Sequence, residues 1–377
     1  MKRENYQRAV LPDHRPYAQE RSCALGPLCL LFLSLLFFSS CAKQSYYDIN
    51  TRTDYAQNGN VVIRWQVNPG MEGRVKIFAS ADASSYPTVP TTEEPISKQI
   101  ATIPFSTPGF SERYFLMVFD GRESRVVSNR TIPTQSFTNL RDIGGYMTKE
   151  GYQVKWGVIF RGNRIPAPTD VDKQVIATLN LKNNLILDQN SSRRAGGGDS
   201  FLTGQKLNLP PDVPISPDYA RRRILKGEMD QPAVIDARED LLSSYAFENP
   251  KQLSTALHFL LDETHYPILL SDSLGNGRVA VLTALIQSAL GVPQREIIND
   301  YMLSNMLIPV ARLEPEGYKL PAGSQEALIE FYKNRPNDLQ YIFYEINRRY
   351  GSIESYLSKF LSFDTEDIEK LKAILLY

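Results

Sequence analysis

The feature that most constrains the fold is a change in hydrophobic period near residues 132–137. Before it, apolar and polar residues alternate with a period of two, which is typical of strands that bury one face. Beyond it, short apolar runs alternate with segments of helical spacing, which indicates an α/β region. A chain of 377 residues is long enough for two folded units, and this change places the boundary between them.

The alternating region predicts an all-β sandwich over residues 59–133, similar to a fibronectin type III or immunoglobulin-like module. Turn signals at Asn68-Pro69-Gly70 and Asp120-Gly121 separate its strands. Trp65 is expected to pack in the core of this sandwich, with a place on a ligand surface as the alternative. The predicted strands are 61–67, 74–78, 113–119 and 124–127.

The N-terminal segment has the layout of a secretory signal peptide. Its apolar run, residues 24–38, follows several basic residues and is too short to span a bilayer, although a short membrane anchor is the alternative. The run ends Phe38-Ser39-Ser40-Cys41, which resembles the lipobox of bacterial lipoproteins. This resemblance implies cleavage before Cys41 and acylation of its sulfur. The sequence therefore predicts a signal peptide at 1–40 and a polar tether at 41–58.

The same resemblance predicts an exported protein whose lipid anchors it to a bacterial membrane. Ala42 follows the cysteine, which favours the outer membrane because aspartate there is the usual retention signal. Cleavage removes Cys23 and Cys29, and acylation uses Cys41, so the mature chain keeps no free thiol. The three cysteines show no spacing typical of a zinc site or a disulfide framework.

Composition excludes some classes of partner. The chain has 42 basic and 42 acidic residues, so no overall field directs it to nucleic acid or an anionic bilayer surface. With 42% hydrophobic and 22% charged residues it is typical of globular proteins. The sequence shows no cluster that predicts a metal or a cofactor.

In the α/β region, runs at 185–187 and 268–270 predict buried strands, and 279–290 and 327–350 predict helices. The stretch 189–214 is rich in Ser, Gly, Asn and Pro, which predicts a mobile loop. The last helix is expected to start at Thr365, with two acidic residues in its first turn.

One motif in this region reads Thr138-Asn139-Leu140-Arg141-Asp142-Ile143-Gly144-Gly145-Tyr146. It resembles the opening segment N-F-R-D-[LI]-G-G-Y of an atypical tyrosine phosphatase family. The resemblance extends over about residues 137–377 and implies a tyrosine-phosphatase-like domain at 134–377, with a central sheet flanked by helices. Members of this family act on phosphotyrosine, phosphoserine or phosphoinositide.

The family's phosphate loop, H-C-x-A-G-K-D-R-T-G, corresponds to residues 271–280 of this chain. In the family a cysteine thiolate attacks phosphorus, and Asp272 stands at that position here. Asn276 and Gly277 replace the loop's lysine and aspartate. The resemblance therefore implies a phosphate-loop site without its nucleophile, made of Asp272, Ser273, Leu274, Gly275, Asn276, Gly277 and Arg278.

The two retained loop residues have a physical role in such a site. Consecutive N–H groups at a helix N-terminus hold anions, and an arginine fork grips two phosphate oxygens. Gly275 would allow the turn, and Arg278 would be the fork, or alternatively a surface arginine at a helix start. Asp272 is a weak nucleophile, and its charge opposes a phosphate by about 1 to 4 kcal/mol at 4 Å.

Other candidate groups give weaker signals. Asp188 matches the aspartate of the family's D-L-R-S segment, but the next two residues differ. His258 and His265 lack metal-ligand spacing, and Ser273 has no recognisable base.

Three functions remain open from sequence. The leading hypothesis is a membrane-anchored member without catalysis, which binds a phosphorylated or other anionic ligand, or a protein. The second is a divergent phosphoprotein or phosphoinositide phosphomonoester hydrolase that uses Asp272. The third assigns the function to the sandwich, as a carbohydrate or peptide binder. A basic pocket around Arg278 would favour the first, and exposed aromatic residues on a sheet face would favour the third.

Overall fold

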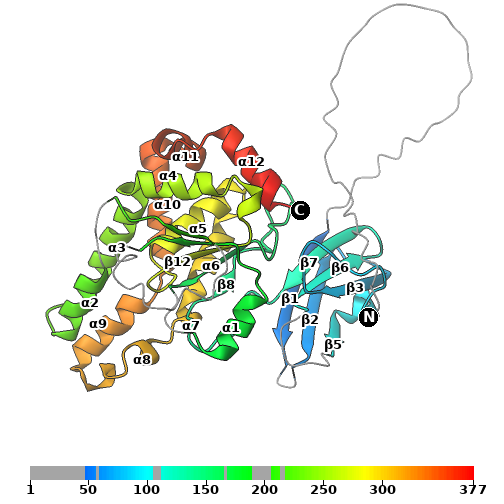
Figure 1. The fold of residues 1–377 in the computed structure, drawn as a ribbon, viewed down its shortest axis with the longest axis horizontal. Helices are drawn as coiled ribbons and strands as arrows, with labels where there is room; N and C mark the ends of the chain where they lie inside the picture. The colour runs from blue at the N-terminus through cyan, green and yellow to red at the C-terminus, as the bar shows by residue number, and fades with distance from the viewer. Residues whose placement is uncertain (1–46, 57–58, 105–111, 165–167, 189–204, 213–216) are drawn as a thin grey trace, which may run out of the picture.

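The computed structural model describes residues 47–56, 59–104, 112–164, 168–188, 205–212 and 217–377. These residues form a β-rich N-terminal region and a larger α/β region beside it (Figure 1). Cys41 and the predicted signal peptide lie outside the described residues. No helix within the described ranges is both long and apolar enough to cross a bilayer.

The N-terminal region consists of two antiparallel sheets that pack on one another. One sheet has the order β1-β2-β5 and the other β4-β3-β6-β7. Side chains from both sheets meet in one apolar core, as the period-two pattern predicts. The strands are β1 (Asp48–Tyr55), β2 (Val61–Asn68), β3 (Arg74–Ser80), β4 (Thr92–Pro95), β5 (Ile100–Ile103), β6 (Tyr114–Phe119) and β7 (Glu123–Ser128).

Trp65 lies in this core, as predicted. Its side chain is only 3% exposed, and its Nε1 donates to the carbonyl of Ile96 at 2.8 Å. The indole meets Phe119 edge to face at 6.5 Å between ring centroids. Trp65 therefore fills the space between the sheets.

The predicted tether is wrong for Asp48–Tyr55, which forms strand β1. This strand pairs with β2 along its whole length, from Asp48 opposite Asn68 to Tyr55 opposite Val61. The sequence gives no alternating hydrophobic pattern for β1, because β1 is an edge strand whose only fully buried apolar residue is Ile49. Tertiary pairing overrides the polar composition here. The fibronectin or immunoglobulin assignment stays a prediction.

The α/β region is built on a five-stranded sheet of order β11-β10-β12-β9-β8. The first four strands are parallel and β8 is antiparallel to β9. Its strands are β8 (Arg141–Asp142), β9 (Ile159–Asn163), β10 (Asn183–Ile186), β11 (Gln205–Asn208) and β12 (Ile268–Asp272). Within the loop predicted over 189–214, residues 205–208 therefore form a strand, and 189–204, 213 and 214 lie outside the described residues.

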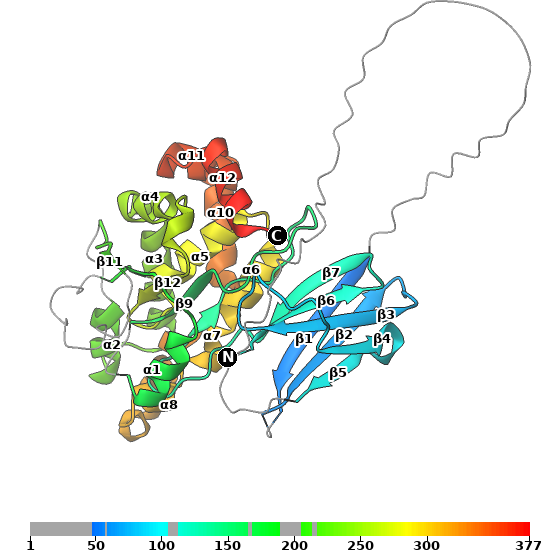
Figure 2. The ribbon, with the colours of Figure 1, turned by 45° about the vertical axis from the view of Figure 1, so that its right-hand side comes forward.

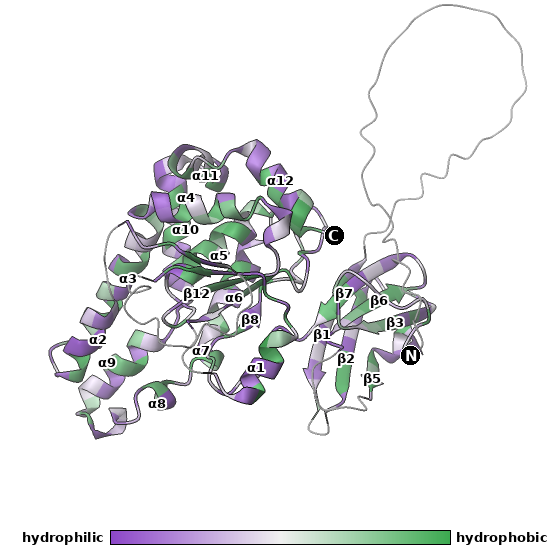
Figure 3. Cartoon of the chain, viewed as in Figure 1, coloured by the Kyte–Doolittle hydropathy of each residue, from purple (hydrophilic) through white to green (hydrophobic). Residues whose placement is uncertain are grey.

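Helices cover both faces of this sheet. Leu269 and Phe160 pack against α1 on one face, whereas Ile268 and Leu270 pack against α4 and α5 on the other. Figure 3 shows the apolar residues gathered around α5 and the central strands. The helices are α1 (Asp170–Ala177), α2 (Pro217–Leu225), α3 (Gln231–Phe247), α4 (Pro250–Phe259), α5 (Arg278–Ala289), α6 (Gln294–Met302), α7 (Ser304–Leu307), α8 (Val310–Leu313), α9 (Ala322–Tyr332), α10 (Pro336–Tyr350), α11 (Ile353–Leu361) and α12 (Thr365–Leu375).

The helix predictions are confirmed with one difference. The segment 327–350 forms two helices: α9 ends at Tyr332 and α10 begins at Pro336. Proline fits the first turn of a helix but disfavours helical backbone in the residue before it. α12 starts at Thr365 as predicted, and the side chain of Asp364 caps it by accepting from the N–H groups of Glu366 and Asp367.

The two regions are in contact (Figure 2). Trp156 of the α/β region packs among apolar residues of the sandwich, and its Nε1 donates to the carbonyl of Val126 at 2.8 Å. The Gln153 amide bonds both backbone groups of Val126, at 3.0 and 2.8 Å. Tyr377 donates its hydroxyl to the carbonyl of Ala83. These bonds fix the junction with directional contacts as well as apolar packing.

Candidate functional site

The predicted phosphate loop lies between the C-terminal end of β12 and the N-terminus of α5. In open α/β sheets this is the edge where ligands bind. Gly275 turns the loop with φ of +65°, and a Cβ there would lie 2.4 Å from the backbone carbon of Gly162 on β9. The loop is therefore packed directly against the neighbouring strand, and only glycine fits at this turn.

The carboxylate of Asp272 points into its own loop. Its Oδ1 accepts from the N–H groups of Leu274 at 3.0 Å, Gly275 at 2.6 Å and Asn276 at 3.2 Å. Its Oδ2 accepts from the N–H of Val279 at 3.0 Å. The side chain is 5% exposed. Backbone N–H groups at a helix N-terminus commonly hold a bound oxyanion. Here the carboxylate of Asp272 accepts hydrogen bonds from such groups instead.

Arg278 is the first residue of α5 and is buried, so it is not the surface arginine of the alternative prediction. Its guanidinium lies over the ring of Tyr245 on α3, 4.4 Å from the ring centroid. Burial is the largest cause that raises the pKa of Tyr245. Tyr245 therefore stays neutral and serves as the wall on which the arginine is stacked.

The other two altered loop positions have partners elsewhere in the fold. Asn276 and Asn334 form a reciprocal amide pair, with Nδ2-to-Oδ1 distances of 2.8 and 2.9 Å. Asn334 also donates to the carbonyl of Tyr301, at 2.7 Å. A Cβ on Gly277 would lie 2.9 Å from the ring of Tyr245. An aspartate therefore cannot occupy position 277 while Tyr245 keeps its place.

Asn139, from the opening motif, holds the backbone of the 272–278 loop through its side-chain amide. Its Nδ2 donates to the carbonyls of Leu274 at 3.2 Å and Gly275 at 2.8 Å. The side chain of Arg141 in turn donates to Oδ1 of Asn139. The motif thus holds the loop backbone and does not itself supply reactive groups.

A buried ionic cluster lies under the same loop. Asp300 on α6 pairs with Arg161 at 3.0 Å and with Arg141 at 3.3 Å, and all three side chains are almost fully buried. Arg161 also donates from Nη2 to the carbonyl of Gly275 at 2.8 Å. Strands β8 and β9, helix α6 and the loop are therefore joined through one carboxylate.

Charge balance in this cluster shifts its pKa values. Burial acts to raise the pKa of Asp300, but the two arginines outweigh it and lower that pKa to about 2. Burial, together with the charge of Arg141, lowers the pKa of Arg161 to about 10. At neutral pH the cluster carries two positive charges and one negative charge.

This shift predicts a stability contribution that depends on pH. A carboxyl whose pKa is about 2 when folded and 3.8 when unfolded stabilises the fold fully above about pH 4. That contribution, about 2 kcal/mol, is lost as the pH falls from about 4 to about 2. Urea unfolding at several pH values should show the native chain losing this stability relative to Asp300→Asn. A difference between the two chains that does not change with pH would contradict the assignment.

Asp142, also in the motif, organises the turn that follows it. Its Oδ1 accepts from the N–H of Gly144 at 2.8 Å and its Oδ2 from that of Gly157 at 2.7 Å. Complete burial raises the pKa of Asp142, against the lowering effect of Arg113 and of these two bonds. Its role is therefore to join two segments of backbone.

The remaining candidates lie apart from these clusters. His258 bonds the carbonyl of Ser254 through Nδ1, at 2.8 Å, within α4. His265 stacks on Phe259 with 3.8 Å between ring centroids. Asp188 follows β10, and its charge acts on Tyr245. In the ranges that the structure describes, no three His, Cys, Asp or Glu side chains converge as a metal site.

Sequence reasoning missed the residues that close the loop. Tyr245 and Asn334 come from α3 and from the turn before α10, far from the loop in sequence. Neither belongs to a motif, so no local pattern indicates their contact with Gly277 and Asn276. Asp300 lies within the span 137–377 that resembles the family, but its pairing with two arginines is visible only in the fold.

Comparison with known proteins assigns the second region. The family model described as "Tyrosine phosphatase family" matches residues 132–377. No curated protein matches the chain. Among solved structures, the core catalytic domain of the PP-IP phosphatase SIW14 from S. cerevisiae in complex with citrate is similar, with 19% identity and a TM-score of 0.27, covering 58% of this chain and 96% of that chain. A second structure, of the Siw14 catalytic core, has 14% identity, a TM-score of 0.26 and the same coverage.

Proposed function

Because the chain belongs to the tyrosine phosphatase family, we propose that it is a member without phosphatase activity, exported and lipid-anchored, which acts by binding. The observation that supports this proposal is the position of Asp272. Its carboxylate stands where the family has a thiolate and accepts four backbone N–H groups.

Geometry weighs against Asp272 as a nucleophile. Its Oδ1 accepts three hydrogen bonds and its Oδ2 a fourth, so Oδ1 is fully engaged and Oδ2 keeps one lone pair. Hydrogen bonding also stabilises the carboxylate and reduces its nucleophilicity. A phosphate would meet a negative charge instead of free donors, which disfavours binding in the cradle as well as reaction.

The neighbouring substitutions support the same proposal. Asn276 is held by Asn334 in a reciprocal amide pair, which turns its amide away from a loop-bound ligand. An aspartate at position 277 would collide with the ring of Tyr245, because a Cβ there lies 2.9 Å from that ring. The loop has thus become a structural element whose polar groups bond within the chain.

The experiment is an aryl-phosphate hydrolysis assay on the purified full-length chain, with and without magnesium. The native protein, Asp272→Ala, Arg278→Ala and Asp272→Cys should all stay at the rate of the blank. Asp272→Cys should stay silent because positions 276 and 277 still lack the family's lysine and aspartate. Turnover by the native chain that disappears in both alanine variants would overturn the proposal and make Asp272 catalytic.

A binding measurement gives an independent prediction. Removal of the carboxylate frees the N–H groups of Leu274, Gly275, Asn276 and Val279, so Asp272→Ala should gain oxyanion affinity. Tungstate should raise the melting temperature of Asp272→Ala and leave that of the native chain unchanged. Asp272→Asn, which keeps the shape and loses the charge, is the matched control. Strong tungstate binding by the native chain would show that the cradle is open.

The anchoring part of the proposal rests on the lipobox-like sequence at Cys41. Expressed in a bacterium with labelled palmitate, the native chain should incorporate label and partition into the membrane fraction. Cys41→Ser should lose both properties. Equal labelling of the two chains would exclude lipidation at this cysteine.

A further inference from the structure

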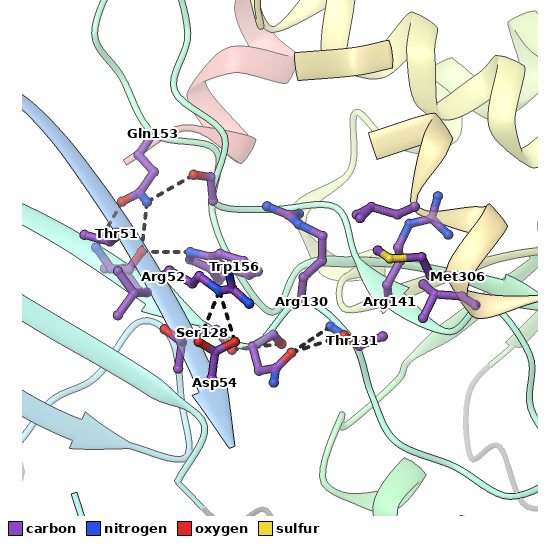
Figure 4. A pocket seen from close by; sticks show the side chains of 17 residues that line it. Thr51, Arg52, Asp54, Ser128, Arg130, Thr131, Arg141, Gln153, Trp156 and Met306 are labelled. Carbon is purple, nitrogen blue, oxygen red and sulfur yellow. Dashed lines mark hydrogen bonds and ion pairs between the residues drawn. The ribbon is translucent and has the colours of Figure 1, made fainter. Parts of the chain in front are cut away.

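A cavity lies where the sandwich meets the α/β region, apart from the loop of Asp272. Its volume is about 430 Å³, within the range of small-molecule sites, which often lie at domain junctions. Edge strand β1 and the segment after β7 form one wall. Residues between β8 and β9, together with α7, form the other (Figure 4).

Arg130 is fixed rigidly in this cavity. Its Nη1 donates to the carbonyl oxygens of Asp142 at 2.9 Å and Gly144 at 2.7 Å. Its guanidinium lies 3.9 Å from the ring centroid of Tyr146 and 4.8 Å from that of Trp156. A guanidinium held on one edge and packed against two aromatic rings has lost most of its conformational entropy before any ligand arrives.

The other edge of this guanidinium remains available. Within the described part of the chain, Nε and Nη2 of Arg130 make no hydrogen bond, and neither is among the fully buried atoms. These two donors form the side-on fork that matches the two oxygens of a carboxylate. Figure 4 shows Arg130 among the other lining side chains, between Trp156 and Met306.

The charges around the cavity favour a monoanion. Arg52 at the rim is paired with Asp54 at 3.1 Å, and Arg141 is paired with Asp300. Among the described lining cations, Arg130 makes no ion pair with a carboxylate, although its charge acts on the buried Asp142 and Asp300. Asp54 is paired with both Arg52 and Arg64, so one uncompensated cation matches one negative charge on a ligand.

The remaining lining groups favour a hydroxylated ligand. Thr51 and Ser128 offer hydroxyl groups. The hydroxyl of Thr131 donates to Oδ1 of Asn129 at 3.2 Å, which leaves Nδ2 of Asn129 as a donor. The Oγ1 of Thr53 is buried without a hydrogen-bond partner, so it does not face a ligand in the cavity. We propose that this junction cavity binds a small hydroxylated monocarboxylate of the sugar-acid type, with its carboxylate on Nε and Nη2 of Arg130.

This site is independent of the proposed loss of catalysis, since none of the residues of the loop 272–278 lines it. Both regions contribute to the cavity, so the ligand would contact the sandwich through β1 and the α/β region through the β8–β9 segment. Binding would therefore stabilise the junction that Gln153 and Trp156 already hold.

The test is isothermal titration of the full-length chain with D-glucuronate, with D-glucose and D-glucose 6-phosphate as comparison ligands. Saturable binding of glucuronate, tighter than that of the other two, is the expected result. Arg130→Gln should weaken it by about 10- to 100-fold, the effect of losing a charged hydrogen-bonding group. Arg295→Gln, an arginine on α6 whose side chain is 87% exposed, should leave it unchanged.

Arg130→Lys provides a second variant, because Arg130 also supports backbone carbonyls and its complete loss could unfold the junction. This change keeps the positive charge and a donor for those carbonyls but removes the side-on fork, so affinity should fall by about 5-fold. The proposal is overturned if the native chain does not bind glucuronate, or binds it no better than glucose. It is also overturned if a folded Arg130→Gln binds glucuronate as the native chain does. If Arg130→Gln does not fold, native-like binding by Arg130→Lys overturns it.

Discussion

Replacement of Asp300 by asparagine is expected to cost about 3 to 5 kcal/mol of unfolding free energy, because it leaves two buried guanidinium groups without their counter-charge. Arg141 and Arg161 are 0% and 1% exposed, and both pair with this one carboxylate. Asparagine keeps the size of the side chain, so the loss reports charge and not a cavity. Urea denaturation followed by circular dichroism measures the difference.

The matched control is Asp170→Asn on α1. Asp170 pairs with Lys173 at 2.7 Å, but its side chain is 90% exposed, so its removal should leave the unfolding curve in place. The free energy of unfolding of a whole domain is only about 5 to 15 kcal/mol. An Asp300→Asn chain that does not fold is therefore also consistent with the expected loss. Equal curves for the native chain and both variants would show that the ionic cluster is not structural.

Replacement of Gly275 by alanine is expected to cost about 3 kcal/mol. The left-handed backbone at φ of +65° costs a residue with a Cβ about 1 to 2 kcal/mol. The new Cβ would also lie 2.4 Å from backbone of Gly162, which cannot move aside as a flexible side chain can. The loop must therefore separate from β9, and Asp272 should lose part of its hydrogen bonding with it.

Thermal unfolding of Gly275→Ala and Gly70→Ala separates this effect from a general effect of alanine. Gly70 has no atom within 4 Å of the position of a Cβ, so alanine there should change the melting temperature little. A Gly275→Ala chain as stable as Gly70→Ala would mean that the loop lies farther from β9 than described.

The sequence predicted the architecture of the α/β region because its signals are strong and local. The buried run of β12 and the apolar residues of α5 have no other stable place than the centre of a layered fold. Strand β1 escaped prediction because its side chains are mostly polar and its stability comes from pairing with β2. A pattern read along the chain does not report a partner strand.

The motif indicates which residues make up the loop, but it does not indicate the conformation of the loop. The position of Asp272 in the loop could be found from the motif, but the motif does not show where the carboxylate points. Four N–H groups around it are a property of the turn, which depends on Gly275 and on its contact with Gly162. The junction cavity was missed for a similar reason, since β1 and α7 are joined only by the fold.

The contact between Gly277 and Tyr245 has a consequence for the evolutionary path of this loop. Cysteine at 272 alone would lack the neighbouring acid, and an aspartate at 277 alone would collide with the ring of Tyr245. Smaller residues at 245 would first remove the wall on which Arg278 is stacked. Under the proposed loss of catalysis, a return to the family's loop would therefore require coordinated changes at positions 272, 277 and 245.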